Sequence, residues 1–285
     1  MEVQEDHEQS ERQLQKSIEQ IKDQNKTQGK NGLYSHSGIN PYQTIINLIR
    51  HDLVDMSEKS IEKIIHPVIE TVISSNQLIA DKVNALRLVV FIKGHPISKK
   101  FDLTPYYHEV INNEEKVLIG RDDPFEKHSN NTLMFNYVML KTLHQNDYAP
   151  IHILSQFNET NTFEKIEALK TVNEMASYGN ELEQGNLLVL MQFVLSLCHS
   201  NNHDVRFWAV KALLLMITEE TSDTILTQVS QMMDYDSAYI KSQVINKFDE
   251  LMKMNKQITK LMVQKVSVDN HYVVRQRGLE YLNSM

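Results

Sequence analysis

The chain has 285 residues, of which 41% are hydrophobic, so it can bury a core as one elongated repeat domain or as two compact domains. A net charge of -8 repels phosphate backbones and disfavours nucleic acid as a partner, while a single cysteine, Cys198, excludes an internal disulfide framework. No apolar run is long enough to cross a bilayer, and the first residues do not resemble a secretory signal, so we expect a cytoplasmic protein that makes no membrane contact.

Residues 1–39 are polar, being rich in Glu, Gln, Lys, Ser and Asn. Such a composition buries too little apolar surface to offset the entropy of an ordered chain, so we expect a flexible segment or a detached helix. Leu14, Ile18 and Ile21 are the exception, because their spacing places them on one helix face. The alternative is therefore that this face docks on the rest of the protein or on another chain.

Residues 40–285 are predicted to form one α-helical repeat domain. It begins at Asn40, where an amide cap is followed by proline at the first helical position. A second helix is expected after Ser57, with Pro67 inside it, and a proline at that point should kink or divide the helix. A third helix should end at Gly94, which is followed by His and Pro.

The repeats predicted over residues 40–180 are degenerate, and the pattern is loosest from 99 to 131, where a short helix after Thr104 is expected. Three further helices are predicted from their apolar residues, over 133–143, 151–157 and 163–175.

The regular part of the chain, residues 186–285, is best seen in the helix predicted over 203–216. Its apolar residues step by four, three and four, which places Val205, Ala209, Ala212 and Met216 on one stripe. Asp204 is expected to cap this helix, because its carboxylate can accept a backbone N–H of the first turn.

Two later helices fit the same template, one after Asp236 and one after Asp269. In each copy a cation follows the first apolar residue, so Arg206, Lys241 and Arg275 recur after 35 and 34 residues. Self-similarity at this period is typical of stacked helix pairs.

A second apolar helix precedes each copy, over 187–197, 225–233 and 258–263, and the short polar loops between them require antiparallel neighbours. No β-hairpin dipeptide separates alternating apolar runs. The predicted fold class is therefore all-α.

The run Asp204-Val205-Arg206, followed by Ala209 and then Ala212-Leu213, resembles the second helix of a HEAT-type repeat. The resemblance is strongest over residues 186–285. It implies a right-handed α-solenoid of antiparallel helix pairs whose concave face binds a partner. Members of this family often carry an aspartate six residues before the arginine, a spacing that only Asp269 keeps here.

The repeated cations allow two interpretations. Arg206, Lys241 and Arg275 would form a basic stripe for an acidic partner, or they would bond carbonyls and carboxylates between repeats, which is the interpretation that we favour. Trp208 is likewise either a core residue or an aromatic anchor on the binding face. Residues 241–285 carry a surplus of four positive charges, which could steer an acidic protein, a phosphate-bearing ligand or another copy of the chain.

No catalytic residue, cofactor site or metal site is assigned. Cys198, His199 and His203 carry atoms that bind metals, but a closed zinc site needs four ligands in a recognisable spacing. The H-E-x-x-H motif and the two common glycine-rich phosphate-binding loops are absent.

The predicted function is that of a non-enzymatic scaffold or adaptor that binds another protein along the concave face. One alternative is a nucleic-acid-binding protein similar to the HEAT-like DNA base-excision enzymes, which the net charge disfavours. A lyase or chaperone built on degenerate repeats is a third possibility, for which no residue signature is present. The last predicted helix runs to Met285 with no capping helix after it, so self-association through this C-terminal edge is also expected as an option.

Overall fold

A computed structural model describes residues 2–27, 40–121, 130–145, 162–176 and 184–284. Within these ranges all regular secondary structure is helical, which confirms the all-α class. The chain divides into two compact units, Met1–Ile153 and Leu154–Met285. The helix predicted over 151–157 lies outside the described residues. In the described part of the chain, no helix is long and apolar enough to cross a membrane.

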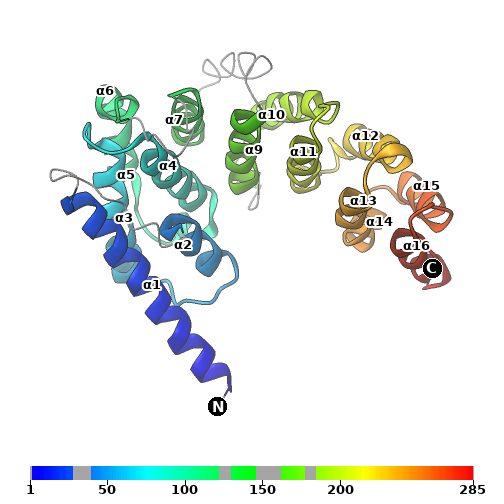
Figure 1. The fold of residues 1–285 in the computed structure, drawn as a ribbon, viewed down its shortest axis with the longest axis horizontal. Helices are drawn as coiled ribbons and strands as arrows, with labels where there is room; N and C mark the ends of the chain where they lie inside the picture. Colours follow the sequence, from blue (N-terminus) through cyan, green and yellow to red (C-terminus); the bar gives the residue numbers. More distant parts are fainter. Residues whose placement is uncertain (1, 28–39, 122–129, 146–161, 177–183, 285) are drawn as a thin grey trace. The chain divides into compact units, whose positions relative to one another are not determined.

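Unit 1 is built around one central helix, α4, which is buried along nearly its whole length and contacts α2, α3 and α7 (Figure 1). The elements of this unit are α1 (Glu2–Thr27), α2 (Pro41–Arg50), α3 (Glu58–Ile73), α4 (Ile79–Gly94), the 3-10 turn η1 (Pro96–Lys99), α5 (Thr104–Asn112), α6 (Glu114–Leu118) and α7 (Asn130–Gln145).

The predicted helix starts of unit 1 are confirmed. The Asn40 side chain accepts hydrogen bonds from the N–H groups of Tyr42 and Gln43, and Ser57 caps α3 in the same way. Of the two effects predicted for Pro67, a kink or a division of the helix, the division is wrong, because α3 continues past Pro67 to Ile73. Burial of the apolar face of α3 outweighs the loss of one backbone donor.

Residues 2–27 form α1, which packs on α2 and α3. Leu14, Ile18 and Ile21 are all buried in this contact. The helix α1 is therefore docked on the rest of unit 1, as the alternative prediction stated, and is not a detached helix. Near the end of α1, Asn25 donates to the Pro67 carbonyl at 2.9 Å and accepts from the Thr71 hydroxyl at 2.8 Å. Residues 28–39, the remainder of the segment expected to be flexible, are not described.

No sequence pattern predicts that α4 contains a fully buried lysine. Lys82 has no exposed surface, and its Nζ donates to the carbonyls of Lys116, Val117 and Ile119 at 2.5–3.2 Å. Burial lowers the pKa of Lys82 to about 8, so the ammonium is still charged at neutral pH and has three protons to donate. Lys82 therefore caps the C-terminal end of α6, where helix carbonyls lack partners.

Replacing Lys82 with methionine, which has a similar length and no donor, should destabilise the chain by about 3 kcal/mol, because buried carbonyls lose their hydrogen bonds. Urea unfolding at pH 7 measures this loss. Lys59→Met, at an exposed lysine of α3, is the matched control and should leave the unfolding midpoint almost unchanged. Equal midpoints for both variants would contradict the capping role.

Unit 2 consists of two rows of helices, which Figure 1 shows in green to red. Row B contains α9 (Thr162–Ala176), α11 (His203–Leu215), α13 (Ala238–Ile245), α14 (Phe248–Met254) and α16 (Tyr272–Ser284). Row A contains α10 (Gln184–Leu197), α12 (Ser222–Tyr235) and α15 (Lys256–Ser267). In row B, α11 contacts α9 and α13, and α13 contacts α16; α12 contacts α15 in row A.

Two of the three predicted apolar stripes of unit 2 are buried in the structure, whereas the third, in α16, is buried at Val274 and Gly278 but 40% exposed at Leu282. The stripe residues of α11 and of α13–α14 are at most 3% exposed, namely Val205, Ala209, Ala212, Met216, Ile240, Val244, Phe248 and Leu251. Two details of the prediction are wrong. Asn202, not Asp204, caps α11, since its side chain accepts from two backbone N–H groups and Asp204 is already inside the first turn. The helix expected over 239–251 is divided at Asn246, a residue type whose side chain competes for backbone hydrogen bonds.

Gly278 allows α16 to lie directly against α15. A Cβ atom at this position would stand 2.7 Å from the Ser267 nitrogen and from the Val266 carbonyl carbon, both of which are backbone atoms. Only glycine fits this contact unless the two helices move apart.

Gly278→Ala should therefore destabilise the chain by about 2 kcal/mol, even though alanine is the better helix former. Thermal melting measures the effect. Gln276→Ala, at an exposed position of the same helix, is the control and should shift the melting temperature very little. A rise in melting temperature for Gly278→Ala would show that α15 and α16 do not approach this closely.

Candidate functional site

The first repeated cation, Arg206 of α11, joins one helix pair to the next. Its Nε and Nη2 donate to the two carboxylate oxygens of Asp236 at 2.9 and 3.0 Å. Its Nη1 donates to the Ser200 carbonyl at 2.9 Å. Asp236 lies in the loop before α13, so the bidentate ion pair links α11 to the start of α13.

Lys241 of α13 repeats this arrangement one helix pair later. Its Nζ lies 2.6 Å from Oδ2 of Asp269, which is in the loop before α16, and both side chains are less than 10% exposed. Arg275 of α16 follows the same design in part, because its Nη1 donates to the Asp269 carbonyl at 2.6 Å, as Arg206 does to Ser200. We call Arg206, Lys241 and Arg275 the cation series.

These contacts support the interpretation that the cations bond between repeats. The guanidinium of Arg206 and the ammonium of Lys241 both contact carboxylates of the next helix pair, so neither is available to form a basic stripe on the surface. The hydrogen bond with Asp236 raises the pKa of Arg206 above its usual value. Burial alone would raise the pKa of Asp269, but hydrogen bonds from Lys241 and from the His271 N–H outweigh it, and the pKa lies below 3.8.

Lys241→Met should destabilise the chain by about 3 kcal/mol at pH 7, because it leaves the Asp269 carboxylate buried and unpaired. The folded chain binds the Asp269 proton less tightly than the unfolded chain does. The stabilisation is therefore fully present above the pKa that Asp269 has in the unfolded chain. It is lost as the pH falls through the pKa that Asp269 has in the folded chain.

Urea unfolding at several pH values tests this pair. The difference in the free energy of unfolding between the parent and Lys241→Met should be largest at neutral pH. It should shrink below about pH 4, where Asp269 becomes protonated. Lys247→Met removes an exposed pair with Glu250 and should cost well under 1 kcal/mol, which makes it the matched control. A difference in the free energy of unfolding that stays constant from pH 7 to pH 2 would show that the ion pair with Asp269 is not how Lys241 stabilises the chain.

A cluster of aromatic rings and lysines lies on row B around Trp208. The Nζ atoms of Lys170 and Lys211 stand 5.7 and 4.6 Å from the centre of the Trp208 ring, and Phe207 makes an edge-to-face contact with it at 5.7 Å. The side-chain amide of Asn173 donates to the Trp208 carbonyl at 3.3 Å, which ties α9 to α11. Trp208 is neither a fully buried core residue nor a fully exposed anchor, because it is half-buried between two cations.

The cluster extends to the next helix of row B through Tyr239. This ring stacks on Phe207 with 4.7 Å between centroids and 20° between planes. It is 58% exposed, whereas Phe207 is half-buried beneath it. We call Lys170, Phe207, Trp208, Lys211 and Tyr239 the aromatic–lysine surface. Lys170 is also paired with the Glu167 carboxylate at 2.7 Å. The surface therefore combines rigid apolar area with the ammonium group of Lys211, and such side chains are frequent where proteins bind one another.

Sequence reasoning had singled out only Trp208 from this surface. Lys211 follows Trp208 by three residues, so helical spacing could have placed the two together. Tyr239 and Lys170 lie on other helices, 31 residues after and 38 residues before Trp208. They meet Trp208 and Phe207 only through the packing of successive helices, which no local pattern encodes.

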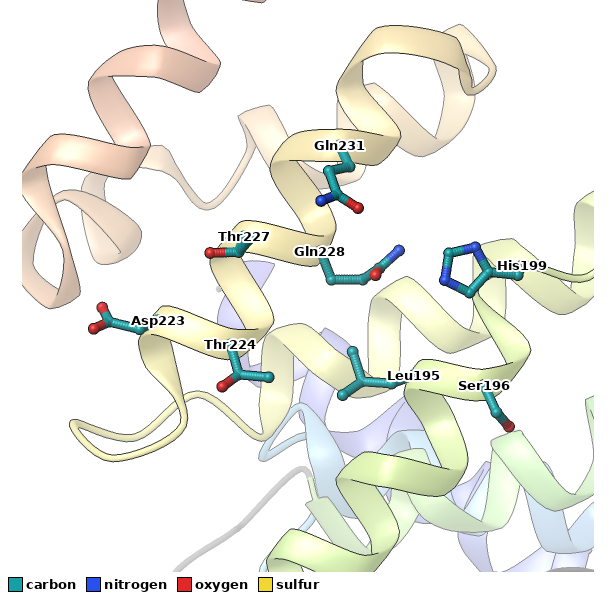
Figure 2. A pocket seen from close by; sticks show the side chains of 8 residues that line it. All are labelled: Leu195, Ser196, His199, Asp223, Thr224, Thr227, Gln228 and Gln231. Atoms are coloured by element: carbon teal, nitrogen blue, oxygen red, sulfur yellow. The ribbon is translucent and has the colours of Figure 1, made fainter.

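A pocket of about 670 Å³ lies between α10 and α12 (Figure 2). Leu195 is the one aliphatic residue that lines it, together with Ser196, His199, Asp223, Thr224, Thr227, Gln228 and Gln231. Four of the α12 residues follow helical spacing and present two hydroxyls and two amides along one face. Asp223 is held by a hydrogen bond from Asn255 at 2.6 Å. Hydroxyls and amides can bind polar groups through hydrogen bonds.

The three metal-capable residues do not come together. Cys198 is fully buried, and burial raises the pKa of its thiol to about 12, so the thiol stays protonated. His199 lines the pocket, whereas Nε2 of His203 lies 2.7 Å from the hydroxyl of Ser237. Among the residues whose positions are described, no group of three His, Cys, Asp or Glu side chains could hold a metal ion.

Comparisons with known proteins add no assignment to these observations. No family model, no curated protein and no solved structure matches this chain.

Proposed function

We propose that this chain is a non-enzymatic scaffold or adaptor, similar to HEAT-type arrays, that binds another protein across the aromatic–lysine surface of row B. The proposed architecture is a right-handed α-solenoid of antiparallel helix pairs, regular over residues 186–285 and degenerate before them. A reducing compartment such as the cytoplasm would suit the single buried thiol.

One observation carries the proposed function, namely the exposed Tyr239 ring stacked on Phe207, whose own ring lies 5.6 Å from the ammonium group of Lys211. A large flat ring that is held in place loses little entropy when a partner covers it. Lysines at the edge of such a patch favour a partner with acidic residues and speed its approach. Two features support the repeat architecture, the contacts along row B and the similar reach of Arg206 and Lys241 to Asp236 and Asp269.

Nucleic acid is the weaker alternative. A protein that binds DNA must neutralise several phosphates, and the chain carries a net charge of -8. Two of the three cations that would have formed a basic stripe already pair with carboxylates of the protein, which lowers the support for this alternative further.

The test is affinity capture with the whole chain, followed by mass spectrometry and titration of the purified partner. Tyr239→Ala removes the exposed ring and Lys211→Glu reverses one charge, and each should weaken binding by at least about tenfold, or 1.4 kcal/mol. Affinity should also fall as salt concentration rises, because exposed charges are screened.

Leu188→Ala is the matched control, since Leu188 is an exposed apolar residue of unit 2 on α10, in the other row. It should leave the affinity unchanged. Circular dichroism must show that all three variants keep the helix content and melting temperature of the parent. A partner that binds the Tyr239 and Lys211 variants as tightly as the parent would overturn the proposed surface.

A further inference from the structure

The two rows of unit 2 differ in how closely their helices pack. In row B each helix contacts the next, from α9 through α11 and α13 to α16. In row A, α12 packs against α15 but makes no comparable contact with α10, and the pocket of about 670 Å³ lies between α10 and α12 (Figure 2). Both helices that flank the pocket are described, so the pocket interrupts row A from within and is not an open end of the array.

The two sides of α12 differ in their hydrogen bonds. On the side of α15, the Ser230 carbonyl and the Asp234 carboxylate both accept from Lys265 at 2.7 Å. On the side of the pocket, four lining side chains have no hydrogen-bond partner among the residues that the structure describes, namely Thr224, Thr227, Gln228 and Gln231. The polar groups of α12 are therefore paired toward α15 and unpaired toward the pocket.

Gln228 shows this most clearly. Its Nε2 is buried and has no acceptor within the described chain. Figure 2 shows the amide of Gln228 extending between the two helices, toward His199 of α10. Buried amide donors in folded proteins nearly always have an acceptor, so an unpartnered one marks a position where a ligand supplies it. The terminal torsion of a glutamine is soft, and a small rotation turns Nε2 into the pocket.

The spacing of the four side chains matches an extended peptide. Thr224 and Gln228, like Thr227 and Gln231, are four residues apart and so about 6 Å apart along the helix axis. An extended chain advances about 3.3 Å per residue and directs the N–H and C=O of every second residue to the same side, a repeat of about 6.6 Å. A glutamine amide donates and accepts, so it can bind both groups of one residue. Main chain that lies along α12 can therefore meet both pairs.

The charge of the pocket restricts its occupant further. Asp223 is the one carboxylate among the residues that line the pocket in the described chain, and none of them is a lysine or an arginine. Asn255 donates to Oδ1 of Asp223 at 2.6 Å, whereas Oδ2 has no partner among the described residues. A basic side chain of the occupant can bind Oδ2, and an acidic one would be repelled.

We propose that the pocket between α10 and α12 binds an extended peptide segment of another protein through its main chain, with a lysine or arginine of that segment on Asp223. Gln228 and Gln231 donate to carbonyls of the segment and accept from its N–H groups, and Leu195 contacts one of its apolar side chains. A helix does not suit this pocket, because its N–H and C=O groups already bond one another. The pocket differs from the aromatic–lysine surface of row B and does not depend on it.

The probe is a library of short linear peptides displayed on mRNA. The library is selected for binding to the full chain and depleted on the double variant Gln228→Leu/Gln231→Leu, and the tightest surviving peptide is synthesised with a fluorophore. In fluorescence anisotropy, each single variant should bind this peptide at least about tenfold more weakly than the parent, because a leucine of similar size cannot bind the main chain. Gln264→Leu, at an exposed glutamine of α15, is the matched control and should bind as the parent does.

Changes in the peptide test how it is held. An ester in place of one peptide bond removes an N–H and keeps every side chain, so at least one ester analogue should bind the parent chain about tenfold more weakly. Exchange of the basic residue for norleucine should weaken binding to the parent chain and cost nothing further in Asp223→Asn, because both changes remove the same ion pair. On addition of the peptide, the side-chain amide NMR signals of Gln228 and Gln231 should shift, while that of Gln264 stays in place.

Any of three results overturns the proposal. They are the loss of every peptide in the depletion, ester analogues that all bind as tightly as the amide, and circular dichroism showing that the bound peptide is helical. The variants must keep the melting temperature of the parent. The ester series and the NMR shifts use the parent chain alone, so they decide the outcome even if a variant unfolds. Tyr239→Ala should leave peptide binding intact, which separates this pocket from the proposed function.

Discussion

The register between successive helices of row B depends on a partly buried cation that must contact a carboxylate. Arg206 of α11 contacts the aspartate before α13, and Lys241 of α13 contacts the aspartate before α16. A charge withdrawn from water is tolerated only where oxygen atoms replace the water, so a shift of one pair against the next would leave both partners unsatisfied. Apolar stripes bring the helices together without fixing their position along the axis, and these ion pairs supply that constraint.

Unit 1 meets the same physical requirement with backbone oxygens. Lys82 is fully buried in the first turn of α4, and three carbonyls at the end of α6 surround its ammonium group. The last carbonyls of any helix lack intrahelical partners and carry partial negative charge, so a lysine is well matched to them. In both units a cation therefore joins one helical element to the end of another.

Local patterns in the sequence predicted much of the fold. The cap at Asn40, the end of α4 at Gly94 and the buried stripe of α11 all follow from residues a few positions apart. Competing local signals caused one of the errors. Asn202 and Asp204 are both good capping residues, and nothing in the sequence ranks one above the other.

Contacts between distant residues could not be predicted in the same way. The sequence favoured a bond from Arg206 to an acceptor between repeats but did not identify which one, because the carboxylate comes from Asp236, 30 residues later. No local pattern predicts the burial of Lys82, because its three acceptors lie more than 30 residues away and are backbone atoms. The stacking of Tyr239 on Phe207 likewise exists only once α11 and α13 are side by side.

The burial of Cys198 has a practical consequence for solution experiments. With its pKa near 12 and no exposed surface, this thiol presents almost no thiolate to a maleimide or iodoacetamide reagent at neutral pH. A cysteine introduced on the surface would therefore react far faster than the native one. Fluorophores or spin labels can be attached at chosen positions of the natural chain without first removing Cys198 from the core.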